Sequence, residues 1–169
     1  YKANKEQELL KLQSLIQEQR KVVESFETTI LDIHEYIQTN RQASFQIKQV
    51  NKAQVVEITM RIADDGSHSV DREKVFIYDI ALLLNKYTRG KHPGFLIHDN
   101  IFDVDQDTLE KSLQFLHQKA KFGEMQYILT LNADRLANSN NFLFDEHVRA
   151  RFTKQNRFLK KKYQQTKNS

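Results

Sequence analysis

The chain lacks cysteine and tryptophan altogether, and its 169 residues include only one proline and four glycines. Without cysteine it can form neither a disulfide framework, nor a thiolate zinc site, nor a cysteine nucleophile. No apolar run approaches the roughly 18 residues that a membrane span requires, and the N-terminus lacks the apolar core of a signal peptide. These absences predict a soluble, cytoplasmic protein. A hydrophobic fraction of 39% is enough for a sizeable core.

The scarcity of glycine excludes a complete phosphate-binding loop. Such loops need glycine where the backbone approaches the anion or takes a positive φ angle. No pair among Gly66, Gly90, Gly94 and Gly123 matches GxxxxGK[ST] or GxGxxG. The chain begins at Tyr1 rather than Met, which suggests a fragment or processed product whose missing N-terminal part carries such a loop.

Positive charge is concentrated at the C-terminus. Eight Lys and Arg residues and no acidic residue follow Glu146. Because the whole chain has a formal charge of +4, residues 1–146 carry 4 − 8 = −4. Phe152, Phe158 and Tyr163 interleave with these bases, a pattern compatible with phosphate contacts and base stacking. A solvated basic tail over residues 153–169 is the alternative interpretation.

Residues 5–40 contain no glycine or proline and are predicted to form one long helix. Apolar residues recur there at alternating steps of three and four, as in the a and d positions of a coiled coil. The series, with a glutamine as its one polar member, is Leu9, Leu12, Ile16, Gln19, Val23, Phe26, Ile30, Ile33 and Ile37. We therefore expect a coiled-coil helix over residues 1–43, with an ordinary bundle helix as the alternative.

The apolar pattern changes to a period of two beyond the long helix. Residues 56–62 alternate apolar and polar side chains, which predicts a half-buried strand, and residues 45–50 are its expected hairpin partner with Asn51-Lys52 in the turn. Asp71 is the expected N-cap of a largely apolar, buried helix that runs to Leu84.

A strand–helix–strand unit is predicted farther along the chain. Residues 94–99 and 127–131 are short apolar runs that suit buried parallel strands. Residues 105–121 between them predict a helix that is capped at Asp105 or Asp107. Such a unit is right-handed by default. Residues 142–152 are expected to form a final edge element.

Polar residues stand where the two parallel strands end. Asp99 ends the first strand, Thr130 ends the second, and Asn132 follows. Because the carboxyl ends of parallel strands lie at one edge of a sheet, Asp99 is a candidate ligand for Mg²⁺ beside a nucleotide. Asp103 and Asp105 supply two further carboxylates, although capping of the next helix is their alternative role. A metal-dependent nuclease built on the three aspartates ranks lower, because their spacing puts them on a turn.

Several of these segments resemble a known family. The stretches that carry the likeness are Gly66 to Arg72, Pro93 to Asp99, Phe102-Asp103 and Tyr127 to Asp134. They resemble the C-terminal part of SMC-type or RecN-like coiled-coil ABC ATPases and, more narrowly, the YydD-like proteins with their FLIHD…FD…TLN pattern. The resemblance spans roughly residues 5–152.

The resemblance implies an α/β fold, the C-terminal half of a P-loop, ABC-type ATPase head with a mixed or parallel sheet. A long coiled-coil helix precedes the head lobe, which covers residues 44–152. ATP and Mg²⁺ are the implied cofactors, bound between two dimerised heads. A Walker A-bearing N-terminal half, in the same chain or a separate one, completes each head. DNA is the implied partner of the basic tail, with no role for a membrane.

The family also implies roles for individual residues. Asp99 binds Mg²⁺, and Asn100 stands where the family has a glutamate base, so slow or conditional ATP hydrolysis is expected. The candidate catalytic positions are His98, Asn100 and Asn132. The candidate nucleotide contacts are Ser67, Ser69 and Arg72 in the signature segment (residues 67–72), Asp103 in the D-loop (residues 102–105) and Thr130 in the switch region.

The competing hypothesis is a non-catalytic module for coiled-coil dimerisation or nucleic-acid binding through the basic tail. In that case Asp99 has no role, and binding to DNA depends on salt. Zinc binding is not expected, because the spacing of His34, His92, His117 and His147 does not suit zinc ligands. These four histidines are predicted to lie at the surface.

Overall fold

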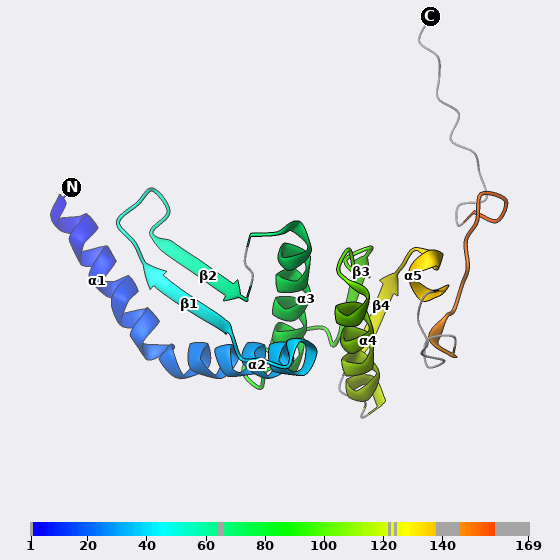
Figure 1. Ribbon diagram of the computed structural model, residues 1–169. Coiled ribbons are helices and arrows are strands. Elements are labelled where there is room, and N and C mark those ends of the chain that lie inside the picture. The colour runs from blue at the N-terminus through cyan, green and yellow to red at the C-terminus, as the bar shows by residue number, and fades with distance from the viewer. Residues whose placement is uncertain (1, 64–65, 122, 124, 138–145, 158–169) are drawn as a thin grey trace, which may run out of the picture.

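The computed structural model describes residues 2–63, 66–121, 123, 125–137 and 146–157. It is an α/β fold with two small sheets, and helix α3 contacts one sheet through β2 and the other through β3 (Figure 1). The elements in chain order are α1 (Lys2–Glu18), α2 (Arg20–Gln38), β1 (Ala43–Gln49), β2 (Val56–Ile62), α3 (His68–Leu84), the 3₁₀ turn η1 (Arg89–Lys91), β3 (Phe95–Asp99), α4 (Gln106–Lys121), β4 (Gln126–Thr130) and α5 (Ala133–Ala137).

The helix expected over residues 5–40 is two helices, because the regular backbone stops at Gln19. The ψ angle of Gln19 is 4°, far from the helical value of about −42°, although its N–H still donates to the Leu15 carbonyl at 3.0 Å. The two helices leave this point in different directions (Figure 1). α1 contacts β1, whereas α2 also contacts α3 and α4. The bend thus separates two halves that pack on different elements.

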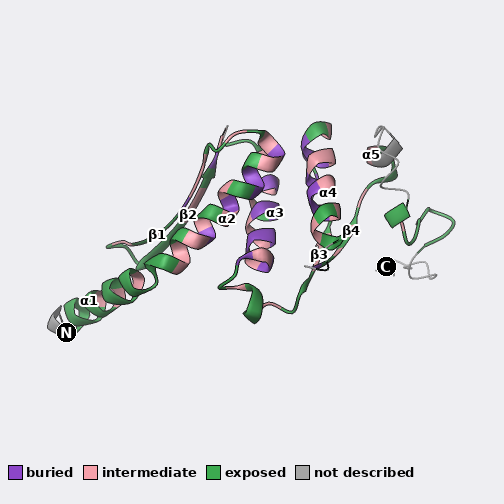
Figure 2. Ribbon diagram, turned by 90° about the horizontal axis from the view of Figure 1, so that it is seen from below, coloured by how far each residue is buried: buried purple, intermediate pink, exposed green. Residues whose placement is uncertain are grey.

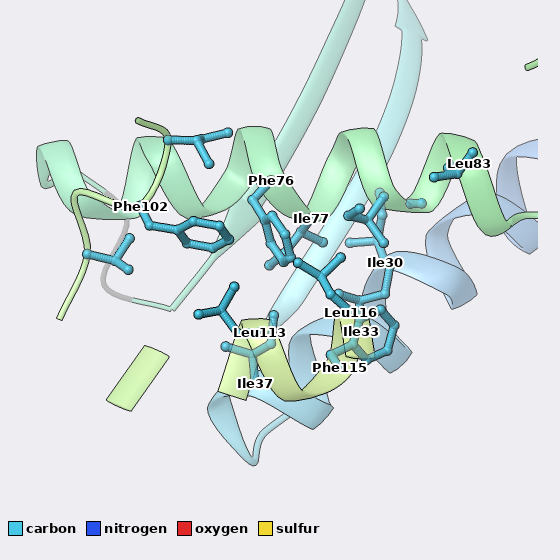
Figure 3. Packing of buried hydrophobic residues seen from close by; sticks show 14 of the residues in the cluster. Ile30, Ile33, Ile37, Phe76, Ile77, Leu83, Phe102, Leu113, Phe115 and Leu116 are labelled. Carbon is cyan, nitrogen blue, oxygen red and sulfur yellow. The ribbon is translucent and has the colours of Figure 1, made fainter. Parts of the chain in front are cut away.

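The apolar seam of α2 lies inside the core. Figure 3 shows side chains from α2, α3 and α4 and from the segment after β3 packed together, and Figure 2 shows that α1 is mostly exposed. The buried side chains labelled there are Ile30, Ile33, Ile37, Phe76, Ile77, Leu83, Phe102, Leu113, Phe115 and Leu116. Because α2 uses its seam within the chain, the coiled-coil expectation is confined to α1.

The predicted hairpin is confirmed. β1 and β2 pair antiparallel from Ala43 opposite Ile62 to Gln49 opposite Val56. The loop is longer than Asn51-Lys52, since it spans residues 50–55 and is closed by a bond from the Val50 N–H to the Val55 carbonyl at 3.0 Å. The expected half-burial is wrong at the loop end, where Val56 is exposed, because the hairpin extends away from α3 (Figure 1).

Helix α3 begins earlier than the sequence pattern indicates. Its N-cap is Ser67 rather than Asp71, and the Ser67 hydroxyl accepts a hydrogen bond from the Val70 N–H at 3.3 Å. Asp71 lies in the first turn, where its negative charge suits the helix dipole, and pairs with Lys74 at 3.1 Å. The helix is buried on one face only, because Val75 is exposed.

The strand–helix–strand prediction is confirmed in its connectivity. β3 and β4 pair in parallel from Phe95 beside Gln126 to Asp99 beside Thr130, and α4 joins them. The α4 side chains expected to point inward are buried; they are Leu109, Leu113, Phe115 and Leu116. Both strands alternate between exposed and half-buried side chains, so within the described residues the sheet is covered on one face rather than two.

The C-terminal predictions fall largely outside the described residues. Residues 142–145 of the expected edge element and residues 158–169 of the basic tail are not among them. Residues 146–157 contain a short 3₁₀ turn, and all but one of their side chains are exposed. Within the described part of the chain, no helix combines the length and apolar character needed to cross a lipid bilayer.

Candidate functional site

The carboxyl ends of β3 and β4 bring Asp99 and Thr130 together. The two residues are register partners in the parallel pair, and the Thr130 hydroxyl donates a hydrogen bond to Asp99 Oδ1. Both residues are exposed, on the same face as Phe95, Ile97 and Ile128. This arrangement presents an oriented carboxylate at the sheet edge where open α/β sheets bind ligands.

Asn100 turns the chain immediately after this carboxylate. It has a left-handed φ of 51°, which asparagine tolerates better than most residues. Its N–H donates to the Thr130 hydroxyl at 3.1 Å and lies 3.3 Å from the Thr130 carbonyl. The Thr130 hydroxyl, at the end of β4, therefore accepts a hydrogen bond from the Asn100 N–H and donates one to the Asp99 carboxylate. Both partners lie at the end of β3, so these bonds hold the ends of the two strands together.

The carboxylate oxygens at this edge suit a Mg²⁺ ion whose other ligands are water and phosphate oxygens. Mg²⁺ in nucleotide sites takes one or two protein carboxylates and fills its octahedron with water and phosphate oxygens. Asp99 supplies one exposed carboxylate, already oriented by Thr130. Among the residues that the structure describes, no three His, Asp or Glu side chains gather in a way that could hold a metal ion. The residues therefore suit a cation that arrives with phosphate rather than a protein-enclosed metal centre.

His98 lies on the opposite face of β3 from Asp99. Its Nε2 is 2.9 Å from Asp79 Oδ2 on α3, and its Nδ1 is 2.6 Å from the Tyr127 hydroxyl on β4. Burial raises the pKa of the Tyr127 phenol, and the charge of Asp79 raises it further, so the hydroxyl stays protonated. In the neutral imidazole, Nε2–H donates to Asp79 and Nδ1 accepts from Tyr127. The contacts join α3 to the sheet and do not bring His98 to Asp99.

Arg135 supports the loops beside the candidate site, and the sequence interpretation missed it. From α5 its Nη2 donates to the Phe102 carbonyl at 3.1 Å and to the Val104 carbonyl. These bonds hold the segment after β3 against the segment after β4. Asp103 is exposed in the first segment. In the second, the Asn132 carbonyl accepts a hydrogen bond from the Arg135 N–H at 3.1 Å. No local sequence signal indicates this role, because the contacts join residues more than 30 positions apart.

The first turn of α3 holds the candidate signature residues. The Ser67 and Ser69 hydroxyls lie 3.0 Å apart, and Arg72 is half-buried one turn later. A cleft of about 180 Å³ brings Ser69 together with Asp105, the residue that precedes α4. The structure thus joins this part of the expected signature segment to the end of the expected D-loop.

Two carboxyl groups in this cleft have shifted pKa values. Burial raises the pKa of Glu73, and the nearby charge of Asp105 adds to the rise, while a hydrogen bond from Gln38 opposes it. Burial also acts to raise the pKa of Asp105, but hydrogen bonds from the Thr108 N–H and hydroxyl outweigh it, so the net shift is downward. Asp105 Oδ1 accepts the Thr108 N–H at 2.9 Å, which confirms Asp105 as the cap of α4.

Comparison with known proteins gives one family and a set of solved structures. Residues 29–163 match a family model described as "Uncharacterised protein conserved in bacteria (DUF2326)". No curated protein matches the chain. The YydD-like assignment stays a prediction.

Two of the similar solved structures are SMC ATPase heads. One, described under "ATP-driven dimerization and DNA stimulated activation of SMC ATPases", is 17% identical, with 71% of this chain and 75% of that chain covered and a TM-score of 0.47. The other, an SMC head bound to the C-terminal winged-helix domain of ScpA, is 15% identical with the same TM-score. That alignment covers 72% of this chain and 39% of the other.

Proposed function

We propose that this chain, which belongs to the family of uncharacterised proteins conserved in bacteria (DUF2326), forms the C-terminal half of an ATPase head. In this proposal it binds Mg²⁺ and ATP together with a Walker A-bearing half and a second head. The observation that carries the proposal is the pairing of Asp99 with Thr130 at an exposed strand edge. The sequence resemblance around these two residues to coiled-coil ABC ATPases supports it.

The proposed roles follow from the contacts at the strand edge. Asp99 holds Mg²⁺ directly or through water, and Thr130 keeps the Asp99 carboxylate oriented. Mg²⁺, when bound, neutralises negative charge on the phosphate oxygens. Asn100, next to Asp99, has no proton-accepting side chain, so hydrolysis is slow unless another group supplies the base. Ser67, Ser69 and Arg72 are the proposed contacts to the nucleotide of the second head, and Asp103 lies at the head interface.

Among the residues that the structure describes, none covers the outer face of the β3–β4 sheet, which supports the proposal that a further layer packs there. Phe95, Ile97 and Ile128 form an apolar face, and Ile97 is 58% exposed. Parallel sheets are normally covered on both faces. Asp99 and Thr130 lie on this same face, at its carboxyl end. In the proposal the Walker A half covers the apolar part and brings its phosphate loop to the polar end.

The test compares Mg²⁺·ATP binding by the completed head with and without Asp99. We expect isothermal titration calorimetry to show at least tenfold weaker Mg²⁺·ATP binding for Asp99→Ala, with the affinity for ATP in excess EDTA unchanged, because the carboxylate acts through the cation. Asp107→Ala is the matched control, since Asp107 is an exposed aspartate that pairs with Lys111 at 2.7 Å on α4. Unchanged Mg²⁺·ATP affinity in a folded Asp99→Ala protein contradicts the proposal.

The exposed bases near the C-terminus favour DNA as a second ligand. Arg149, Arg151, Lys154 and Arg157 are all exposed among the described residues. If the basic tail neutralises about six phosphates, the log–log dependence of affinity on salt has a slope near −5. Removing residues 149–169 should abolish this salt-dependent binding to DNA, whereas Asp99→Ala should leave it unchanged. A flat salt response contradicts this role and leaves the nucleotide proposal standing.

A further inference from the structure

The loop between α3 and β3 carries a cluster of positive charge. It spans residues 85–92, which we call the η1 loop, and no acidic residue lies within it or within five positions on either side. Its strongly basic residues are Lys86, Arg89 and Lys91. The body of the chain, residues 1–146, is net negative, so the loop differs from it in sign. Figure 2 shows the loop as mostly exposed between α3 and β3. It lies at the opposite end of β3 from Asp99.

The charges of the η1 loop are not balanced by neighbouring carboxylates. The side chains of Lys86, Arg89 and Lys91 are exposed, and among the described residues no acidic side chain pairs with them. Such pairs do form elsewhere on the surface, as between Arg20 and Glu24 at 2.7 Å on α2. Cations held close together without partners create a positive potential that attracts polyanions. The loop therefore indicates an anionic ligand.

Polar contacts at its base fix the backbone of the η1 loop. Asn85 is only 3% exposed, and its amide donates to the Ser25 carbonyl on α2 at 2.9 Å. The side-chain oxygen of Asn85 accepts the Tyr87 N–H at 2.9 Å. The Thr88 hydroxyl donates to the Leu82 carbonyl at 2.6 Å. The backbone that carries the cations is thus ordered before a ligand arrives, which lowers the entropy cost of binding.

Tyr87 places an aromatic ring among these cations. The residue is 42% exposed, and Lys86 Nζ lies 5.0 Å from the centroid of its ring. Cations beside an exposed ring suit single-stranded nucleic acid, whose phosphates contact the cations while an unpaired base stacks on the ring. A base inside a duplex is already stacked on both faces. An acidic peptide or an anionic lipid headgroup would satisfy the charges but would give Tyr87 no stacking partner.

We propose that the η1 loop binds single-stranded nucleic acid. Lys86, Arg89 and Lys91 contact successive phosphates, and Tyr87 stacks on one base. Because phosphates and base faces are common to all sequences, the binding has little sequence preference. The inference does not depend on the half-head proposal, and the loop is separate in sequence from the basic tail beyond Glu146.

The test measures binding to the whole chain by fluorescence anisotropy at about 150 mM salt. The probe is a labelled oligothymidylate of about twelve nucleotides, within the usual site size of such proteins. An abasic oligonucleotide of the same length keeps the phosphates without the bases, and it should bind at least fivefold more weakly. Poly-L-glutamate of matched charge should bind at least tenfold more weakly than oligothymidylate.

A charge variant and a matched control separate the loop from general surface charge. The variant with Lys86→Gln, Arg89→Gln and Lys91→Gln should weaken oligothymidylate binding at least tenfold. It should also reduce the log–log salt slope by about 2, since each phosphate contact on a single strand contributes about 0.7. The control removes the same charge from exposed positions on α1 and the hairpin, by Lys5→Gln, Lys48→Gln and Arg61→Gln. It should change affinity less than threefold, because distant exposed charges are screened at this salt concentration.

Substitution of Tyr87 tests the stacking contact separately. Tyr87→Ala should weaken oligothymidylate binding at least fivefold and leave binding of the abasic oligonucleotide within twofold of wild type. Tyr87→Phe keeps the ring, so its affinity for oligothymidylate should stay within twofold of wild type. A merely structural role of Tyr87 would instead lower the affinity for both oligonucleotides alike.

Four results overturn the inference in variants whose urea midpoints match the wild type. These are equal affinity of the loop variant and the control, polyglutamate binding as tight as oligothymidylate, an unchanged preference for bases in Tyr87→Ala, and tighter binding of a duplex than of a single strand of equal length. Each leaves the Asp99 proposal standing, because that proposal is measured with Mg²⁺·ATP.

Discussion

Replacing Tyr127 with phenylalanine removes one hydroxyl group from the contacts between α3, β3 and β4. The hydroxyl is 2.6 Å from His98 Nδ1, and the His98 side chain is 11% exposed, so water can replace the lost partner only in part. A lost hydrogen bond contributes about 1 kcal/mol, and a buried nitrogen left without a donor adds roughly 1 kcal/mol or more. We therefore expect Tyr127→Phe to lower the free energy of unfolding by about 2 kcal/mol.

Urea unfolding followed by circular dichroism measures this loss. With an m-value of about 2 kcal/mol per molar urea, the midpoint should fall by about 1 M. Tyr87→Phe is the matched control, because Tyr87 is 42% exposed, and it should change stability by less than about 0.5 kcal/mol. Equal midpoints for the two variants would refute the assignment of a structural hydrogen bond to Tyr127.

The same variant tests the separation of the two faces of β3. His98 and Tyr127 lie on the face toward α3, whereas Asp99 and Thr130 lie on the exposed face. If nucleotide binds at the exposed edge as proposed, Tyr127→Phe should change the Mg²⁺·ATP affinity of the completed head less than twofold. A tenfold change without a matching loss of stability would instead place the His98 network in the nucleotide site.

Three further outcomes follow from the described contacts. Phe76→Ala removes a fully buried ring that packs on Phe102 at 5.0 Å between centroids, and urea unfolding should show a loss of about 3–5 kcal/mol. Glu73 has a raised pKa in the folded chain, so its contribution favours folding at pH values below the ordinary carboxyl pKa and is lost as the pH rises through the folded-state pKa. Glu73→Gln should therefore flatten the decline of the melting temperature with pH from about pH 4 upward. Arg135→Met removes the donor to two carbonyl groups after β3, so amide hydrogen exchange over residues 101–105 should rise about tenfold, equivalent to about 1.4 kcal/mol.

The pairing of Asp99 with Thr130 at the strand edge could be predicted because it depends on local pattern. Two apolar runs separated by a helix-length segment favour a parallel pair, and the residues that end the runs then lie at one edge. Asp99 and Thr130 are register partners for this reason. Alternation along a strand also implies that His98 and Asp99 point to opposite faces, a consequence that the sequence interpretation did not use when it grouped them as site residues.

His34 shows a prediction that was wrong although a signal was present. It was expected at the surface, yet it is completely buried. Its position four residues after Ile30 and three before Ile37 puts it on the apolar face of α2. The N-cap of α3 was missed for a different reason. Serine and aspartate are both good caps, and only the backbone path decides that Ser67 accepts the Val70 N–H.

The sequence by itself determined which segments are helices and strands, where the strands end, and that no complete phosphate loop lies within these residues. Those properties depend on neighbours within a few positions, since side chains repeat with a period of two or 3.6 residues. Only the tertiary structure decided that the long apolar seam bends at Gln19 and enters the core, and that the described residues leave one face of β3 and β4 open. It also assembled the cleft of His34, Glu73 and Asp105, in which Gln38 contacts Thr108 across 70 positions of sequence. Contacts of that range arise from the packing of whole elements, which no local pattern specifies.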